Sequence, residues 1–249
     1  MATLLDLFHD IDFQCRLFAC LCTAIFSENF LILRELRTAG FVPALFGMLD
    51  MEKHPEMCRY AVLSLANMAS DVDAHSYLVD EITVQQRRFL VLSEAKDVET
   101  VQYFTLLLCN LSVATMPQIV LLQPALLECV CPLALPWKKA AGDQKDLSVE
   151  EMKNMAAANP EMSAENMMKR RSEAVALTPS EIESSKQVLT MLSRVMPKGN
   201  DEARMAVCNA SLDLLLEMCD RPTLPPGAAP LLLCVFRLMS EAEAVQVCV

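Results

Sequence analysis

The feature that most constrains the fold is a repeat with a period of 43 residues. Residues 56–70 align without gaps on residues 99–113, and each copy carries a tyrosine followed seven positions later by an asparagine. The identical pairs at this spacing are Glu56 and Glu99, Tyr60 and Tyr103, Leu63 and Leu106, Leu65 and Leu108, and Asn67 and Asn110. Self-similarity at such a period indicates an array of units, each of which buries its apolar face against its neighbours.

The repeating unit is predicted to be helical. Ahead of residues 56–70, the sequence favours a short helix, a turn at Gly40 and an apolar helix that ends near Leu49. The chain is 53% hydrophobic and has only five glycines. Nowhere does it alternate apolar and polar residues in the manner of a half-buried strand. A fainter copy of the long helix lies 44 residues earlier, and the glycine-turn pattern returns around Gly227. We therefore expect an all-α chain of stacked repeats.

The segments "TAGFVPALFGMLD" and "EMCRYAVLSLANMAS" resemble armadillo repeats, in which a glycine, a short apolar helix and a polar loop precede a third helix ending in Ala-Leu-x-Asn-Leu-Ala. The segment "DVETVQYFTLLLCNLSV" is similar to the repeats of vacuolar armadillo adaptors. The resemblance covers residues 13–136 and, less closely, residues 200–249. It implies an armadillo/HEAT-type right-handed α-solenoid with one long insertion, whose third helices line a concave groove.

An insertion is expected because the interval between Gly40 and Gly227 is longer than whole periods allow. The apolar sequence ends at Trp137, and a polar, methionine-rich stretch follows. The predicted organisation is armadillo-like repeats over residues 1–137, a partly disordered polar insertion over 138–186, and a continuation of the repeats over 187–249 that ends mid-repeat.

Helices are also expected within and after the insertion. Thr178 is followed by a proline and, three positions later, by a glutamate, which is the pattern of a helix start with a capping box. Residues 187–197 are expected to pack back on the solenoid. Residues 202–220 are expected to resume the long helix of the interrupted repeat, with either Asn209 or Asp213 in the place of the asparagine.

Composition limits the partners and the compartment. The formal net charge is −11, so the surface repels phosphate backbones and we expect no nucleic-acid partner. Eleven cysteines, an odd number, lie mostly in apolar helical patterns, which indicates a reducing compartment. Residues 1–12 lack the basic segment of a secretory signal, so we expect a cytoplasmic protein, with a nuclear location as the alternative. Residues 100–127 carry no charge, but Pro117 and Pro124 interrupt them, and we expect no direct membrane insertion.

Catalytic and metal-binding patterns are absent from the sequence. His9, His54 and His75 stand alone, and no nucleophile elbow, phosphate loop or metal-protease motif occurs. The closest cysteine pairs are two residues apart, a spacing that does not bring side chains together on a helix. We therefore expect that the chain is not an enzyme and that it has no catalytic residue, no metal and no cofactor.

The candidate partner-binding residues lie on the two strong copies of the third helix. The resemblance implies that Asn67 and Asn110 bond to the backbone of an extended peptide, and an amide suits this role because it both donates and accepts. The alternative is that each asparagine bonds to the backbone of a neighbouring loop. The nuclear-import receptors of this family place a tryptophan one turn earlier, where this chain has Leu63 and Leu106.

Tyr60 and Tyr103 lie two turns before the asparagines and are candidate walls of the groove, with buried packing as the alternative. Arg59 and Gln102 flank them, are expected to face solvent, and complete the set of six candidate partner-binding residues. We therefore expect a non-enzymatic scaffold or adaptor that binds a protein or peptide partner along the groove. The alternatives are a co-chaperone or assembly factor that binds a chaperone through the methionine-rich residues 148–168, and a nuclear transport adaptor.

Overall fold

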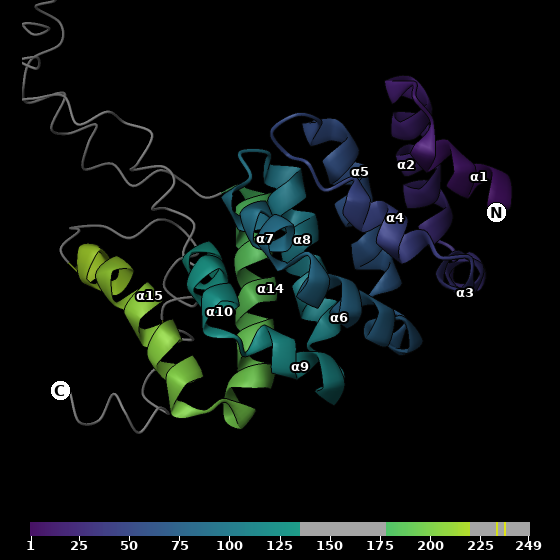
Figure 1. Cartoon of the computed structure of the whole chain (residues 1–249). Helices are drawn as coiled ribbons and strands as arrows, with labels where there is room; N and C mark the ends of the chain where they lie inside the picture. Colours follow the sequence, from purple (N-terminus) through teal and green to yellow (C-terminus); the bar gives the residue numbers. More distant parts are fainter. Residues whose placement is uncertain (135–177, 220–232, 234–236, 238–249) are drawn as a thin grey trace, which may run out of the picture.

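The computed structural model describes residues 1–134 and 178–219, together with Leu233 and Arg237. Throughout this part of the chain the regular elements are helices, and none is a strand (Figure 1). The prediction of an all-α solenoid is confirmed.

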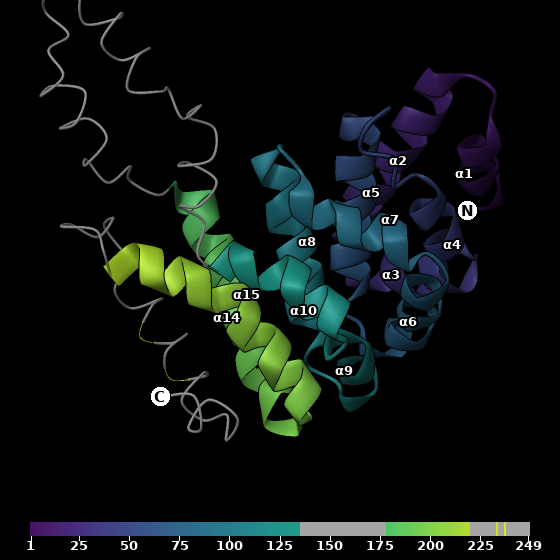
Figure 2. The same ribbon diagram turned by 60° about the vertical axis from the view of Figure 1, so that its left-hand side comes forward.

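The helices form two layers (Figures 1 and 2). One layer holds the long helices α2 (Phe13–Ser27), α5 (Pro55–Met68), α8 (Val98–Leu111) and α14 (Pro179–Val195). We call this layer the ladder and its helices the rungs, because α2 packs on α5, α5 on α8 and α8 on α14. The other layer holds the shorter helices α3 (Phe30–Thr38), α4 (Phe41–Gly47), α6 (His75–Val84), α7 (Gln86–Val91), α9 (Thr115–Leu121) and α10 (Pro124–Val130). The short helix α1 (Ala2–Asp6) precedes the stack, and α15 (Asp201–Cys219) follows it.

The core lies between the two layers and runs from one repeat to the next. The ring of Phe89 is stacked 6.2 Å from Phe46 and meets Phe104 edge-on at 5.2 Å. All three rings are at most 1% exposed. They come from α4, α7 and α8, so they join the second repeat to the third. Burial of side chains of this size stabilises the fold by about 1.5–3 kcal/mol each.

Local sequence signals fix where the helices begin. The side chain of Asp97 accepts a hydrogen bond from the backbone N–H of Thr100 and caps α8. Gly40 begins α4 with φ of +85°, a left-handed conformation that favours glycine. Thr178 and Glu181 form the predicted capping box at the start of α14. The helix start read from the sequence at Thr178 is therefore confirmed.

Two side chains that are 43 residues apart form hydrogen bonds to the backbone at the carboxyl-terminal ends of α5 and α8. His75 Nε2 lies 2.8 Å from the carbonyl oxygen of Ala69, and Gln118 Nε2 donates to the carbonyl oxygen of Ser112 at 2.9 Å. Both side chains are buried. The 43-residue repeat thus preserves this hydrogen bond even though the residue that forms it changes from histidine to glutamine.

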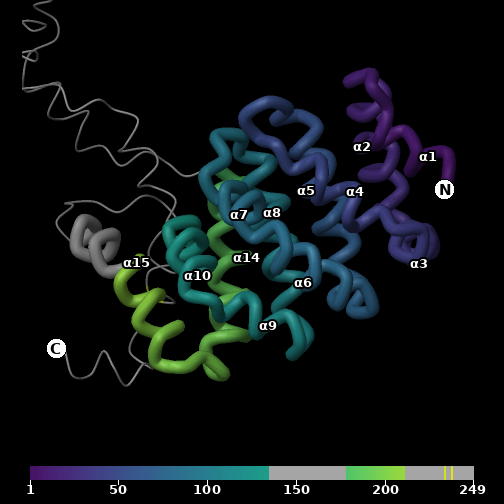
Figure 3. Tube along the Cα trace, viewed as in Figure 1, coloured from purple at the N-terminus to yellow at the C-terminus, as the bar shows by residue number. Residues whose placement is uncertain are grey.

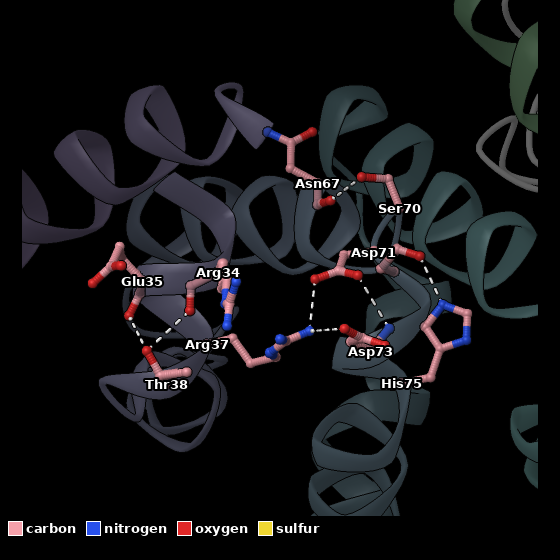
Figure 4. A network of polar contacts seen from close by, with 10 residues as sticks. Arg34, Glu35, Arg37, Thr38, Asn67, Ser70, Asp71, Asp73 and His75 are labelled. Atoms are coloured by element: carbon pink, nitrogen blue, oxygen red, sulfur yellow. Dashed lines mark hydrogen bonds and ion pairs between the residues drawn. The ribbon is translucent and has the colours of Figure 1, made fainter. Parts of the chain in front are cut away.

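An ion pair fastens α3 to the segment after α5 (Figure 4). Arg37 Nη1 lies 2.7 Å from Asp71 and 3.4 Å from Asp73, and the Arg37 and Asp71 side chains are only 11% and 17% exposed. Asp71 also accepts from the backbone N–H of Asp73. The Asn67 side chain points to the opposite side of this end of α5, away from the ion pair (Figure 4).

The fourth rung differs from the sequence prediction. Helix α14 packs against α8, whereas α15, which covers most of residues 202–220, packs against α10 (Figure 3). The expectation that residues 202–220 supply the next long helix of the ladder, with Asn209 or Asp213 in register, was therefore wrong. The predicted domain boundary at residue 186 falls inside α14. The insertion and its methionine-rich residues 148–168 lie outside the described residues, so the three-part division of the chain stays a prediction.

The apolar run over residues 100–127 is divided among α8, α9 and α10. In the described residues, no single helix is long and apolar enough to cross a membrane, and only the pair Thr115–Leu121 and Pro124–Ala134, bent by 79°, matches such a span in length and composition. Among the described residues, Cys15, Cys20, Cys22, Cys58, Cys109 and Cys129 are free thiols.

Candidate functional site

The two strong copies of the repeat place matching side chains on neighbouring rungs. Tyr60, Leu63 and Asn67 lie on α5, and their counterparts 43 residues later lie on α8, which packs directly against α5. All six residues are half-buried. Seven residues make nearly two helical turns, so the tyrosine and the asparagine of a rung share one side of the helix. We call this half-exposed side of the rungs the ladder face.

The asparagines use their amide nitrogens inside the protein. Asn67 Nδ2 donates to Oγ of Ser27 on α2 at 2.9 Å, and Asn110 Nδ2 donates to the carbonyl oxygen of Ala66 on α5 at 3.0 Å. Each asparagine therefore ties its rung to the preceding one. No donor among the described residues bonds to Oδ1 of either side chain. The amide oxygens are thus acceptors on a half-exposed surface.

Arg194 on α14 continues the series of asparagines, which the sequence reasoning missed. Its Nη1 donates to the carbonyl oxygen of Cys109 at 3.1 Å and lies 3.2 Å from Oγ of Ser112. Cys109 is 43 residues after Ala66, so Arg194 bonds to α8 at the position where Asn110 bonds to α5. The remaining nitrogens of the guanidinium have no hydrogen-bond partner in the described part of the chain.

The sequence does carry a signal for α14 as a rung. The signal is the spacing of its polar and buried residues and not the identity of those residues. Gln187 precedes Arg194 by seven residues, as each tyrosine precedes its asparagine. Buried residues fall at the same places as on the other rungs, and on α14 they are Ser184, Ser185, Val188, Leu189, Met191, Leu192 and Val195. Because both polar residues differ in type from their counterparts, a search for identical residues does not find them.

The tyrosines and Arg59 form a polar cluster near the amino-terminal ends of α5 and α8. Arg59 Nη1 lies 2.8 Å from Glu99 Oε2, and its guanidinium carbon lies 5.5 Å from the centre of the Tyr60 ring. Burial, together with the nearby Glu99 carboxylate, raises the pKa of Tyr103. Gln102, on the same turn as Tyr103, is half-buried, as is Arg59. The structure therefore brings all six candidate residues onto two adjacent rungs.

Charge is distributed unevenly along the rungs. Glu56, Asp97 and Glu99 lie at the amino-terminal ends of α5 and α8, where Arg59 offsets part of their charge. At the carboxyl-terminal end, Arg194 pairs with no carboxylate in the described residues. The ladder face thus has an acidic end and a cationic corner.

Metal-binding and nucleophilic groups do not gather on this face. In the described ranges, no group of three or more His, Cys, Asp or Glu side chains is placed to hold a metal ion. Cys20 and Cys58 are buried between α2 and α5, and burial raises the pKa of each thiol to about 12. Such thiols stay protonated at neutral pH and react poorly.

The sequence matches no family model and no curated protein. Solved structures do match. A computationally designed armadillo-repeat protein for modular peptide recognition is 15% identical, with a TM-score of 0.51 over 95% of this chain and 98% of that chain. A designed armadillo-repeat protein in complex with the peptide (KR)4 is 15% identical, with a TM-score of 0.50 over 95% and 98% of the two chains. An engineered protein is 17% identical, with a TM-score of 0.53 over 96% of both. The fold is an armadillo-repeat solenoid.

Proposed function

We propose that this armadillo-type chain is a non-catalytic scaffold that binds an extended segment of a partner protein along its ladder face. The observation that carries the proposal is the pair of amide oxygens at Asn67 and Asn110, which accept no hydrogen bond from the described residues. Each amide is held by a hydrogen bond through its nitrogen, so its oxygen points in a fixed direction before any partner arrives. A preorganised acceptor binds a backbone N–H with little loss of entropy.

The spacing of the rungs suits an extended ligand. Packed helices lie about 8–10 Å apart, and an extended chain advances about 3.3 Å per residue, so two to three ligand residues span one rung. Leu63 and Leu106 lie one turn from the asparagines and offer half-buried apolar surface to the side chains between bonded positions. Backbone bonds would supply affinity, and the apolar positions would supply selectivity.

Charge predicts the direction and composition of the segment. Glu56, Asp97 and Glu99 favour basic ligand residues at the amino-terminal side of the rungs, and the net charge of −11 favours a basic partner overall. Arg194 favours an acidic ligand residue at its corner. Two designed armadillo-repeat proteins of similar fold support the general mode, since one was designed for peptide recognition and one holds the basic peptide (KR)4.

The test begins with a displayed library of random peptides, selected on the wild-type chain. The selected peptides are then titrated against the double variant Asn67→Ala/Asn110→Ala. The matched control is Gln86→Ala, which removes an amide that bonds to Gln123 in the other layer. We expect the double variant to bind about tenfold or more weakly, since two hydrogen bonds of about 1 kcal/mol each are lost. The control should bind like the wild type.

Circular dichroism establishes that the double variant is folded before its affinity is compared. Equal affinity of a folded double variant and the wild type would refute the role of the asparagines. Failure of the wild-type chain to select any peptide would refute binding of an extended segment.

A further inference from the structure

The burial pattern identifies α2 as the first rung and sets its register. The five buried residues of α2 coincide with buried residues of α5 at an offset of 42, two fewer than the offset of 44 suggested by identity. The pairs are Ala19 with Ala61, Cys20 with Val62, Thr23 with Leu65, Ala24 with Ala66, and Ser27 with Ala69. Hydrogen bonds support this register, because Ser27 on α2 and Ser112 after α8 each bond to the carbonyl three residues back and to a side chain of the next rung.

In this register, α2 departs from the other rungs at the positions of the ladder face. Phe18 stands in the place of Tyr60, and Ile25 stands in the place of Asn67. Phe26 occupies the place of Met68, which is 1% exposed, whereas Phe26 itself is 40% exposed. The first rung therefore lacks the polar residues of the later rungs and presents apolar ones.

The apolar surface continues from α2 into α3. Phe18 and Ile25 are each 57% exposed, Phe30 is 70% exposed and Leu31 is 80% exposed. We call Phe18, Ile25, Phe26, Phe30 and Leu31 the α2 end face. Its residues belong to α2 and to the start of α3, and these helices lie at the end of the stack that also holds α1 and the N-terminus (Figures 1 and 2). With side chains of roughly 200 Å² each, the five expose about 600 Å² per molecule.

We propose that the α2 end face pairs with the α2 end face of a second copy of this chain. The helices α5 and α8, which carry the equivalent positions, each pack against a preceding rung, whereas among the described residues no rung precedes α2. A two-fold pairing of α2 with its own copy covers the same five side chains on both partners. It buries roughly 1,200 Å² in total, which is at the lower limit of a stable protein interface.

The size and the charge of the interface fix its expected behaviour. An interface at this lower limit of size is expected to be weak, so the dimer is sought at concentrations of about 1–100 µM. Each copy carries a net charge of −11, so the two copies repel each other at low ionic strength. Salt screens this repulsion, and the dimer should therefore become stronger when the ionic strength rises from about 0.05 to about 0.5 M.

Sedimentation equilibrium of the whole chain over about 1–100 µM tests the pairing. The variant is Phe18→Ser/Ile25→Ser. The control is Val113→Ser/Ile119→Ser, which alters a residue 61% exposed just before α9 and a residue 75% exposed on α9. We expect the first variant to weaken the dimer at least tenfold and the control to leave it unchanged. Because Phe18 and Ile25 are more than half exposed, the variant should keep the helical circular dichroism of the wild type, and Phe18→Ser alone is the milder substitute.

A wild-type chain that stays monomeric at about 100 µM would overturn the proposal. So would a dimer that survives in the folded Phe18→Ser/Ile25→Ser variant, or one that weakens as salt is added. These measurements are made without a peptide, and the Phe18→Ser/Ile25→Ser variant leaves Asn67 and Asn110 unchanged, so their outcome is distinct from that of the peptide titration.

Discussion

Replacement of Asn110 by alanine tests whether the bonds between rungs stabilise the stack. Asn110 Nδ2 donates to the carbonyl oxygen of Ala66, a residue that is 0% exposed. At the end of α5, the backbone N–H of Ser70 donates to the carbonyl oxygen of Asn67 and not to that of Ala66. Within the described residues, the Ala66 carbonyl therefore has no backbone donor and depends on Asn110.

The structure sets the size of the effect. A buried carbonyl left without a partner costs about 1–3 kcal/mol, and water replaces part of the bond because Asn110 is only half-buried. We expect Asn110→Ala to lower the free energy of unfolding by about 1 kcal/mol. For a chain of this length, Tm should fall by about 2–4 °C. Urea denaturation followed by circular dichroism measures the change, with an unchanged m value.

The matched control copies the fourth rung, where Arg194 makes the equivalent bond. Asn110→Arg supplies a donor of the same kind, so it should lower stability by less than about 0.5 kcal/mol. Two outcomes would refute the reasoning: an Asn110→Ala effect within the range of ordinary surface substitutions, or an Asn110→Arg variant as unstable as Asn110→Ala.

Three further predictions concern stability. Arg37→Met removes the partner of the largely buried Asp71 and should lower the unfolding free energy by about 1–3 kcal/mol, with partial recovery in Arg37→Lys, as measured by thermal melting. Phe104→Ala removes a fully buried ring from the core and should cost about 3–5 kcal/mol in urea denaturation, whereas Phe104→Leu should cost less. Burial raises the pKa of Cys20 and Cys58 from 9.0 to about 12, so the folded chain retains protons that the unfolded chain loses above pH 9. Stability should thus be complete below about pH 9 and should fall as the pH rises towards 12, more steeply than in a Cys20→Ala/Cys58→Ala variant, as measured by urea denaturation at each pH.

The sequence was sufficient to predict the second and third repeats because they preserve residue identity. Tyr60 and Asn67 recur as Tyr103 and Asn110 in an unbroken alignment, and the helices α5 and α8 follow from it. The start of α14 was also predictable, since a capping box is a local pattern. The position of α14 in the ladder was not predictable, because it depends on which side of the helix packs against α8.

The sequence predicted where the candidate site lies, but it predicted only part of the chemistry of the site. Position follows from the repeat, which puts both asparagines on one side of adjacent rungs. The use of each amide depends on an atom about 40 residues away in the chain, Ser27 for Asn67 and Ala66 for Asn110. No local pattern specifies such a distant partner. The sequence left a structural bond and a groove role as alternatives. The structure assigns the bond to the amide nitrogen, and no donor in the described part of the chain bonds to the oxygen.

The most direct test of the account asks whether the oxygen of Asn110 accepts a hydrogen bond from a ligand backbone. A peptide selected on the wild-type chain is synthesised with each backbone N–H replaced in turn by N-methyl, and each version is titrated by calorimetry against the wild type and Asn110→Ala. The account predicts that one N-methyl group weakens binding to the wild type about fivefold, a coupling of about 1 kcal/mol, and has no such effect on Asn110→Ala. If every N-methyl group changes the two affinities by the same factor, the ladder face does not bind its partner through this asparagine.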